Sequence, residues 1–150
     1  MKKQFIMRGQ TASSGEEVLN FTGHKEGFGF KLIEFEIYPS TNLGGEADEC
    51  FASITSAKVA SDPINPNFDE EGLIGTAMFK LGVNPSGSGY SGPVTSIINT
   101  EFIITQNLRL SVRDTDGSSP VNWQCKFESV KLNASEEAVT NFKQFSISDG

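Results

Sequence analysis

The runs NLRLSVRD (residues 107–114) and VNWQCKFESVKL (residues 121–132) decide the fold class, because both alternate apolar with polar residues. The apolar positions are Leu108, Leu110 and Val112 in the first run and Val121, Trp123, Cys125 and Phe127 in the second. A period of two is that of a β-strand with one buried side and one side facing water. The intervening TDGSSP contains Asp-Gly, a strong turn signal, so we expect the two strands to form a β-hairpin.

Similar runs fill most of the chain and predict about eight strands. The other strand-like segments are residues 4–8, 17–21, 28–38, 49–59, 73–83 and 94–105. Segments rich in polar residues, glycine or proline separate them, at residues 9–15, 40–48, 61–72 and 84–93. Uneven strands with long connections favour an all-β, jelly-roll-like antiparallel sandwich over an up-and-down meander. Since no repeat recurs at a fixed period, we expect one domain over residues 1–150.

The run FGFKLIEFEIY (residues 28–38) changes its alternation midway. Leu32 continues the apolar positions of the first half, whereas Ile33 and Phe35 begin a second series in the opposite phase. One extra residue in a strand reverses which side chains face the core, so this pattern predicts a β-bulge. Pro39 follows and should end the strand, because proline cannot donate to a central ladder.

Helix signals are confined to the C-terminal segment. Asn133 or Ser135 can cap a helix, and the acidic Glu136 and Glu137 suit its positive first turn. Apolar residues recur there at helical spacing, at Ala138, Val139, Phe142 and Phe145. We therefore expect a short amphipathic helix whose apolar stripe either seals the end of the sandwich or docks onto a neighbouring subunit. Residues 133–150 are thus a candidate subunit-contacting segment.

The formal net charge of -7 disfavours direct nucleic-acid binding, because a phosphate backbone would be repelled. The clearest basic cluster, Lys2, Lys3 and Arg8, belongs either to a solvated first strand or to an arm that contacts a partner. Residues 1–10 are therefore a second candidate subunit-contacting segment. The apolar run at residues 5–7 is too short for a secretion signal, and no stretch approaches the ~20 apolar residues that span a bilayer. We expect a protein made in the cytoplasm, without a membrane span.

Residues that could take part in catalysis, metal binding or a disulfide are few and scattered along the chain. The two cysteines, Cys50 and Cys125, lie in strand-like runs, which favours buried free thiols over a disulfide between strands. His24, the one histidine, is expected in a polar loop. Asp114-Thr115-Asp116-Gly117 begins like a calcium loop, but residue 125 is Cys where such a loop needs Glu, so we interpret it as a turn.

Two acidic groups accompany the loops, Glu46, Asp48 and Glu49 in one and Asp69, Glu70 and Glu71 in the other. Solvated loop charge explains both. We therefore assign no catalytic, cofactor-binding or metal-binding residue, name no cofactor, and expect that the protein is not an enzyme. The alternative is a ligand-binding sandwich, most plausibly a carbohydrate-binding module, in which an aromatic ring stacks on a sugar. Tyr90 is the only aromatic residue of its loop, whereas Tyr38 and Trp123 lie within strands.

Several segments resemble, in character and order, a group of small β-rich proteins of marine viruses and bacteriophages that are thought to be virion components. These segments are GFGFKLIEFEIY (27–38), INPNF (64–68), EFIITQNLRLSVRD (101–114), VNWQCKFESVKL (121–132) and SEEAVTNF (135–142). Residues 84–93 lie outside the resemblance. It implies a jelly-roll virion protein, either a capsid subunit or an accessory, vertex or decoration protein. Such a protein would act by homo-oligomerisation and by contacts with other capsid proteins.

Overall fold

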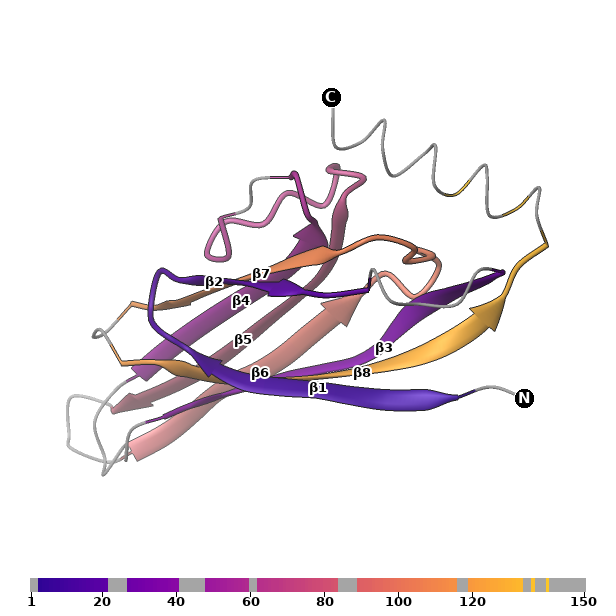
Figure 1. Cartoon of the computed structure of the whole chain (residues 1–150). Helices are drawn as coiled ribbons and strands as arrows, with labels where there is room; N and C mark the ends of the chain where they lie inside the picture. The colour runs from indigo at the N-terminus through magenta and orange to yellow at the C-terminus, as the bar shows by residue number, and fades with distance from the viewer. Residues whose placement is uncertain are drawn as a thin grey trace.

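The computed structural model describes residues 3–21, 27–40, 48–59, 62–83, 89–115 and 119–133, together with residues 136 and 140. Within these residues, eight strands form two antiparallel sheets that pack face to face (Figure 1). The strands are β1 (Gln4–Thr11), β2 (Glu16–Leu19), β3 (Phe28–Pro39), β4 (Asp48–Ser56), β5 (Leu73–Val83), β6 (Gly89–Ile98), β7 (Leu108–Asp114) and β8 (Val121–Lys131). The predicted all-β class and strand number are confirmed.

The strand order identifies a jelly-roll-like sandwich. One sheet has the order β1-β8-β3 and the other the order β2-β7-β4-β5-β6. The pairs β1·β8, β2·β7 and β4·β5 form when a long hairpin folds over on itself, as in a jelly roll. A complete jelly roll would also pair β3 with β6. Here β6 pairs with β5 instead, and β3 is the edge strand of its sheet. The sandwich therefore has an open seam between these two edge strands.

The prediction that residues 107–114 and 121–132 form a hairpin is wrong. The first run is β7, which pairs with β2 and β4, and the second is β8, which pairs with β1 and β3. The two strands therefore lie in different sheets and face each other across the core. Alternation shows which side of a strand is buried but not which strand lies beside it. The chain crosses between layers roughly 10 Å apart in the connection that follows β7.

The predicted β-bulge in β3 is confirmed. Leu32 pairs with Phe127 and Glu34 pairs with Lys126, so Ile33 is the extra residue. Leu32 and Phe35 are consequently both buried, although they are three residues apart. A bulge bends its strand. Beyond the bend, Phe30 exchanges two backbone hydrogen bonds with Ile104, its N–H donating at 2.9 Å and its carbonyl accepting at 2.7 Å.

The first strand, β1, extends to Thr11 and is longer than the strand predicted for residues 4–8. Gly9, expected in a turn, lies inside β1 opposite Trp123. A Cβ on Gly9 would approach Cζ2 of the indole to 2.9 Å, so the missing side chain makes room for the ring. The turn begins only after Thr11 and is held against β7, where Ser14 donates its N–H to Val112 O at 3.0 Å.

The segment around β6 also differs from the prediction. Residues 89–93, expected in an exposed loop, form the first half of the strand. Pro93 is accommodated because β6 is an edge strand and its register slips there: Ser91 pairs with Leu81 and Val94 with Phe79. The predicted strand 94–105 instead ends at Ile98, and a turn follows, in which Glu101 donates its N–H to Asn99 Oδ1 at 3.0 Å.

The core lies between the sheets and is rich in phenylalanine. Phe5, Phe21, Phe30 and Phe127 form one cluster, in which neighbouring ring centroids are 5.0 to 6.2 Å apart. Cys50 and Cys125 are both buried, and no disulfide joins them, as predicted. Burial raises the pKa of the Cys125 thiol far above its usual value, so this group stays protonated and unreactive.

The predicted C-terminal helix lies mostly outside the described residues. At its expected start, Glu136 donates its N–H to Asn133 Oδ1 at 2.8 Å, and Asn133 donates its N–H to Glu136 Oε1 at 3.3 Å. This reciprocal pair is a capping box and selects Asn133 as the cap. Outside the described residues lie Ser135, Glu137, Ala138, Val139, Phe142 and Phe145. The docking of the apolar stripe therefore stays a prediction.

Candidate functional site

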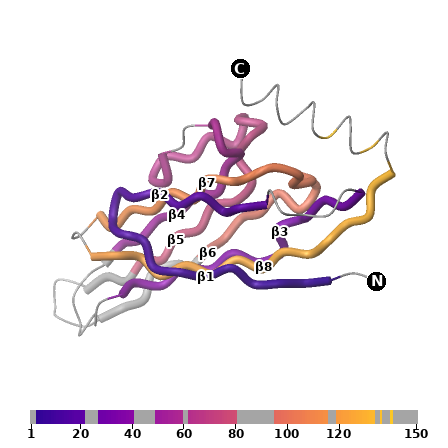
Figure 2. The backbone as a smooth tube through the Cα atoms, in the orientation of Figure 1, coloured from indigo at the N-terminus to yellow at the C-terminus, as the bar shows by residue number. Residues whose placement is uncertain are grey.

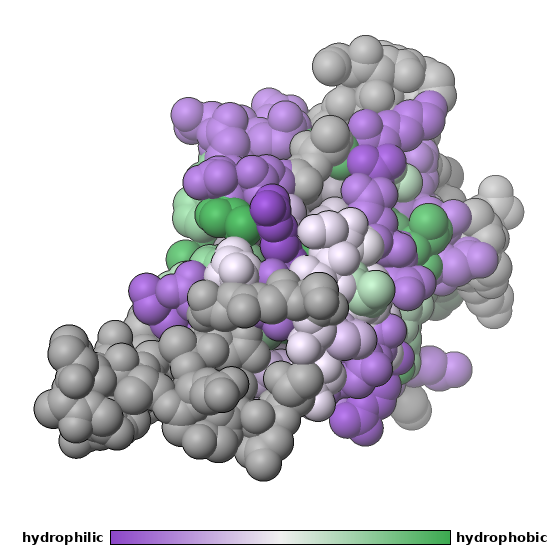
Figure 3. Space-filling view, turned by 90° about the vertical axis from the view of Figure 1, so that its left-hand side faces the viewer, coloured by the Kyte–Doolittle hydropathy of each residue, from purple (hydrophilic) through white to green (hydrophobic). Residues whose placement is uncertain are grey.

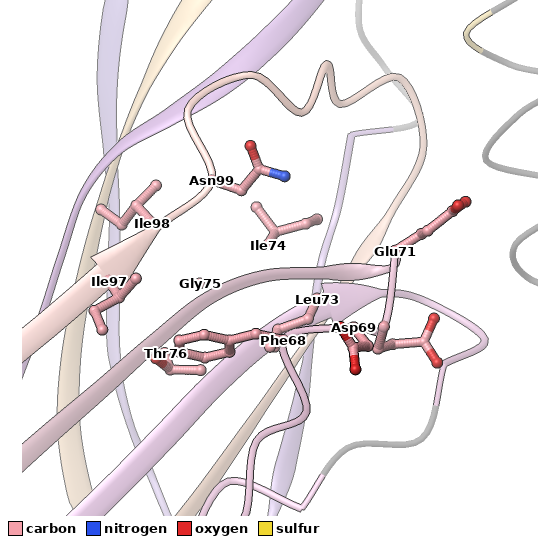
Figure 4. A pocket seen from close by; sticks show the side chains of 11 residues that line it. Phe68, Asp69, Glu71, Leu73, Ile74, Gly75, Thr76, Ile97, Ile98 and Asn99 are labelled. Carbon is pink, nitrogen blue, oxygen red and sulfur yellow. The ribbon is translucent and has the colours of Figure 1, made fainter.

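A hollow of about 400 Å³ opens on the five-stranded sheet where β5 begins and β6 ends. Three short segments line it: residues 68–71, which precede β5, residues 73–76 of β5, and residues 97–99 (Figure 4). We call it the β5–β6 hollow. Segments distant in the sequence meet here because Ile97 and Ile98 pair with Thr76 and Gly75.

The connection before β5 is held in place by its own side chains. Asp62 accepts hydrogen bonds from the N–H of Ile64 and from Asn65 Nδ2, both at 3.0 Å. The bond from Asn65 is the main reason why the pKa of Asp62 lies below its ordinary value. Asn67 Oδ1 accepts the N–H of Asp69 at 3.0 Å. Such Asx turns replace regular secondary structure, so an irregular segment is held at the rim of the β5–β6 hollow.

The connection is also anchored to the outer side of the five-stranded sheet, as the backbone path in Figure 2 shows. The carbonyl of Val59 accepts hydrogen bonds from Thr55 Oγ1 at 3.2 Å and from Arg109 Nη1 at 3.3 Å. Arg109 also contacts Glu16 on β2, with Nε 3.6 Å from Oε2. Part of this outer face is therefore covered by the chain itself.

Apolar and acidic side chains meet in the β5–β6 hollow. Ile74 is buried, whereas Phe68 and Ile97 are exposed to 62% and 51%. In Figure 4 the Phe68 ring lies toward Thr76 and Ile97, and the carboxylates of Asp69 and Glu71 lie at the other end. Large apolar groups exposed side by side and rimmed by polar ones are typical of protein or ligand contacts. Figure 3 likewise shows hydrophobic surface adjoining strongly hydrophilic surface at its left margin.

A second hollow, of about 470 Å³, lies in the open seam between β3 and the β5–β6 pair. We call it the seam hollow. Tyr38, exposed to 61%, projects there with its ring edge-on to Phe79 at a centroid distance of 5.2 Å. Glu36, Thr95 and Ser96 add polar groups to the lining. An exposed aromatic ring beside hydrogen-bonding groups suits a small polar ligand with an apolar face.

The structure separates the two acidic groups named from the sequence. Glu49 forms a salt bridge with Lys80 at 3.1 Å and accepts a hydrogen bond from Thr115 Oγ1 at 3.1 Å. The hydrogen bond from Lys80 is the chief reason why the pKa of Glu49 lies below its usual value. A carboxylate stabilised as an anion suits a structural pair better than proton transfer near neutral pH. Glu46 and the side chain of Asp48 lie outside the described residues.

Asp69, Glu70 and Glu71, expected as solvated loop charge, all line the β5–β6 hollow. Sequence reasoning missed their companions Phe68 and Ile97. Phe68 stands alone within the otherwise polar run NFDEEG (residues 67–72), and this was the available signal, since the run offers no other apolar side chain as a partner. No such signal identified Ile97, because its neighbour Ile98 is equally apolar. Only the pairing of β6 shows which of the two side chains faces outward.

The start of the apparent calcium loop belongs to the sheet. Asp114 is buried at the end of β7, and its N–H donates to Ser13 Oγ at 3.0 Å. The next residue, Thr115, donates its N–H to Glu49 O at 2.9 Å. Asp116 and Gly117 lie outside the described residues, as do His24 and the side chain of Tyr90.

Among the described residues, no three His, Cys, Asp or Glu side chains gather as a metal ion would require. In the same part of the chain, no helix has the length and apolar character needed to cross a membrane.

Comparisons with known proteins give structural likenesses alone. No protein-family model matches the chain. No curated protein matches it either. Among solved structures it is similar to VP1 of Trichodysplasia spinulosa-associated polyomavirus, with a TM-score of 0.46 and 6% identity over 87% of this chain and 96% of that one. A turnip yellow mosaic virus chain has a TM-score of 0.41 and 13% identity over 87% and 92%. A protein of Bacillus endospore appendages, which form disulfide-linked pili, has a TM-score of 0.38 and 7% identity over 89% and 88%.

Proposed function

We propose that this protein is a structural subunit that works by self-association. Its finer role, in this proposal, is that of a virion protein, either a capsid subunit or an accessory, vertex or decoration protein that contacts other capsid proteins. The jelly-roll-like sandwich and the resemblance of its segments to virion proteins support this role. A catalytic activity forms no part of the proposal.

The observation that carries the proposal is the pair of exposed apolar side chains, Phe68 and Ile97, at the β5–β6 hollow. They come from different segments and expose 62% and 51% of their surfaces to water. Covering such groups against a second protein is favourable by roughly 25 cal/mol per Å² of apolar surface. A patch of this kind beside an edge strand is suited to a subunit contact.

The proposal is tested by the mass of the purified protein in light scattering as its concentration is raised. Ile97→Asp should shift the assembly toward monomer, because a charge would enter the apolar contact. Val18→Asp is the matched control, since Val18 is exposed to 67% on β2, away from the hollow. A wild-type protein that stays monomeric at every concentration would contradict self-association.

The seam hollow favours one alternative, a ligand-binding sandwich that recognises carbohydrate. Tyr38 presents an exposed ring beside Glu36, Thr95 and Ser96. If this alternative holds, a glycan-array signal should disappear in Tyr38→Ala and persist in Ile6→Ala, which removes a comparably exposed side chain from the same outer face. A signal lost only in Tyr90→Ala would instead place the ligand at the start of β6.

A further inference from the structure

We propose that two copies of this chain pair along their β1 strands, antiparallel and related by a twofold axis at Ile6. The pairing joins the two three-stranded sheets into one continuous sheet with the strand order β3-β8-β1-β1-β8-β3. This inference rests on the proposed self-association and names a contact distinct from the β5–β6 hollow. The partner of β1 is a second copy of the same strand.

β1 has an open edge on the side away from β8. Ser129 donates its N–H to Lys3 O at 2.8 Å, and every second residue of an antiparallel strand bonds to the same neighbour. The intervening residues, whose backbone N–H and C=O groups point away from β8, are Gln4, Ile6, Arg8 and Gln10. Among the described residues, no strand pairs with β1 on that side. Figure 1 shows β1 along the lower margin of the sandwich.

The other three edge strands are shorter, interrupted or already in use. β2 has four residues, and β6 carries Pro93, where its register slips. β3 ends with Pro39 and already bonds to Ile104 through Phe30. Proline, irregular register and short length are the usual features that keep a sheet edge from pairing with another chain. β1 has eight residues in continuous register and none of these features, so it is the edge best suited to a second copy.

The side chains on the outer face of β1 select the register. Backbone bonding between the two strands requires that residues with outward-pointing groups lie opposite each other. With the axis at Ile6, Ile6 faces its own copy and Arg8 faces Gln4. Ile6 is exposed to 53%, so this pairing removes a large apolar side chain from water on both copies. An axis at Phe5 or Met7 would instead set Ile6 against the polar Gln4 or the charged Arg8, which is less favourable.

The inner face of β1 matches in the same register. Phe5 and Met7 pack against the core but stay partly exposed at the edge. With the axis at Ile6, each Phe5 lies opposite the Met7 of the other copy, and contact between a thioether and an aromatic ring is favourable. Lys3 alternates onto this inner face and lies opposite Gly9 of the other copy, which brings no side chain against it.

The charges of the outer face suit the pairing. Glu128 lies opposite Gln4 on β8 and accepts a hydrogen bond from Gln4 Nε2 at 3.3 Å. Arg8 of the second copy faces this Gln4, so it lies two strand spacings of about 4.8 Å from Glu128. That distance is close to the Debye length of about 8 Å at physiological salt. Lys126, the next cation on β8, lies opposite Glu34 of β3 and is thereby balanced within its own copy.

A twofold contact uses the same surface on both copies and therefore closes at a dimer. Phe68 and Ile97 lie at the β5–β6 hollow on the other sheet and stay exposed in this dimer. The contact along β1 and a contact at the hollow are therefore independent.

Substitution at the twofold axis tests the pairing by sedimentation equilibrium of the full chain. Ile6→Lys and Ile6→Glu should each weaken association at least about tenfold, because each sets two like charges opposite each other. An equal mixture of the two variants should associate at least about fivefold more tightly than either alone, because opposite charges then meet at the axis. Val18→Lys and Val18→Glu are matched controls on β2, where Val18 is exposed to 67%, and should leave association within about threefold.

Ile6→Cys gives a second measurement that introduces no charge. Two residues that face each other in a hydrogen-bonded pair have Cα atoms about 5.5 Å apart, within the range that a disulfide spans. Mild oxidation should therefore cross-link Ile6→Cys into a dimer on a non-reducing gel, whereas Val18→Cys should stay largely monomeric. Equal cross-linking of the two variants would overturn the β1 pairing.

The outcomes separate this inference from the proposed function. A wild type that never associates refutes both. A wild type that associates, with Ile6 variants that act no more than the Val18 controls or a mixture no tighter than its components, refutes the β1 pairing and leaves self-association standing. Circular dichroism of each variant should match the wild type, since both substituted side chains lie on the surface.

Discussion

Trp123 shows how single residues fix the register of the three-stranded sheet. Its indole N–H donates to the hydroxyl of Thr11 at 2.9 Å inside the core, and its ring lies over Gly9. Both partners belong to β1, so a slip of one residue would place a Cβ against the ring and leave a buried donor without its acceptor. A buried polar group that loses its partner costs about 1 to 3 kcal/mol.

Thr11→Val should therefore lower the free energy of unfolding by about 1 to 3 kcal/mol, because it leaves the Trp123 N–H unpaired at nearly constant volume. Urea denaturation followed by fluorescence of the single tryptophan measures this. Ser111→Ala is the control: the Ser111 hydroxyl is buried and has no hydrogen-bond partner in the described part of the chain. Its removal should be neutral or stabilising, and an equal loss in both variants would contradict the role given to Thr11.

At this scale the sequence was informative about burial and uninformative about contacts. The alternation around Cys50 and Cys125 was enough to predict two buried thiols. The contact of Gly9 with Trp123 was not predictable, because it depends on the register between strands at opposite ends of the chain. Phe68 was missed for the same reason, since its neighbours at the hollow come from β5 and β6.

Among the elements, β3 carries the clearest sequence signature. The phase change between Leu32 and Phe35 predicted the bulge, because a strand with one buried face cannot change phase without an extra residue. By contrast, the apparent hairpin of β7 and β8 was wrong, because two strands that face each other across a core show the same alternation as two strands side by side. Only the second half of the edge strand β6 was predicted, because Gly92 and Pro93 indicated a loop. An edge strand tolerates these residues, whereas a central strand would not.

Deleting residues from β3 tests the bulge. Removal of Ile33 should leave Leu32, Phe35 and Ile37 facing the core, because only the extra residue is lost. Removal of Glu36 should instead turn Ile37 outward and expose a large apolar side chain. We expect the second deletion to cost at least about 2 kcal/mol more than the first, close to the burial free energy of one such side chain. Urea denaturation of the two variants measures this, and equal losses would contradict the assignment of the extra residue.

At the scale of the whole molecule, charge opposes assembly. The formal net charge is -7 at pH 7, and the isoelectric point lies near 4.7. Repulsion between copies falls as carboxylates are protonated on the way to that pH. Light scattering should therefore rise reversibly as the pH approaches 4.7 and fall again below it, where the molecule becomes cationic. Scattering that keeps increasing at lower pH would point to unfolding instead of reduced repulsion.

The position of β8 has a consequence for how the protein is made. It is the last of the eight strands along the chain, yet it is the middle strand of its sheet, between β1 and β3. During synthesis on the ribosome, β1 and β3 thus emerge early and wait without their ladder partner until residues 121–131 have left the exit tunnel. Pairings between such distant segments are slow and leave edges open to aggregation. Expression at low temperature, which slows translation and aggregation alike, suits a sandwich whose first strands are completed by its last.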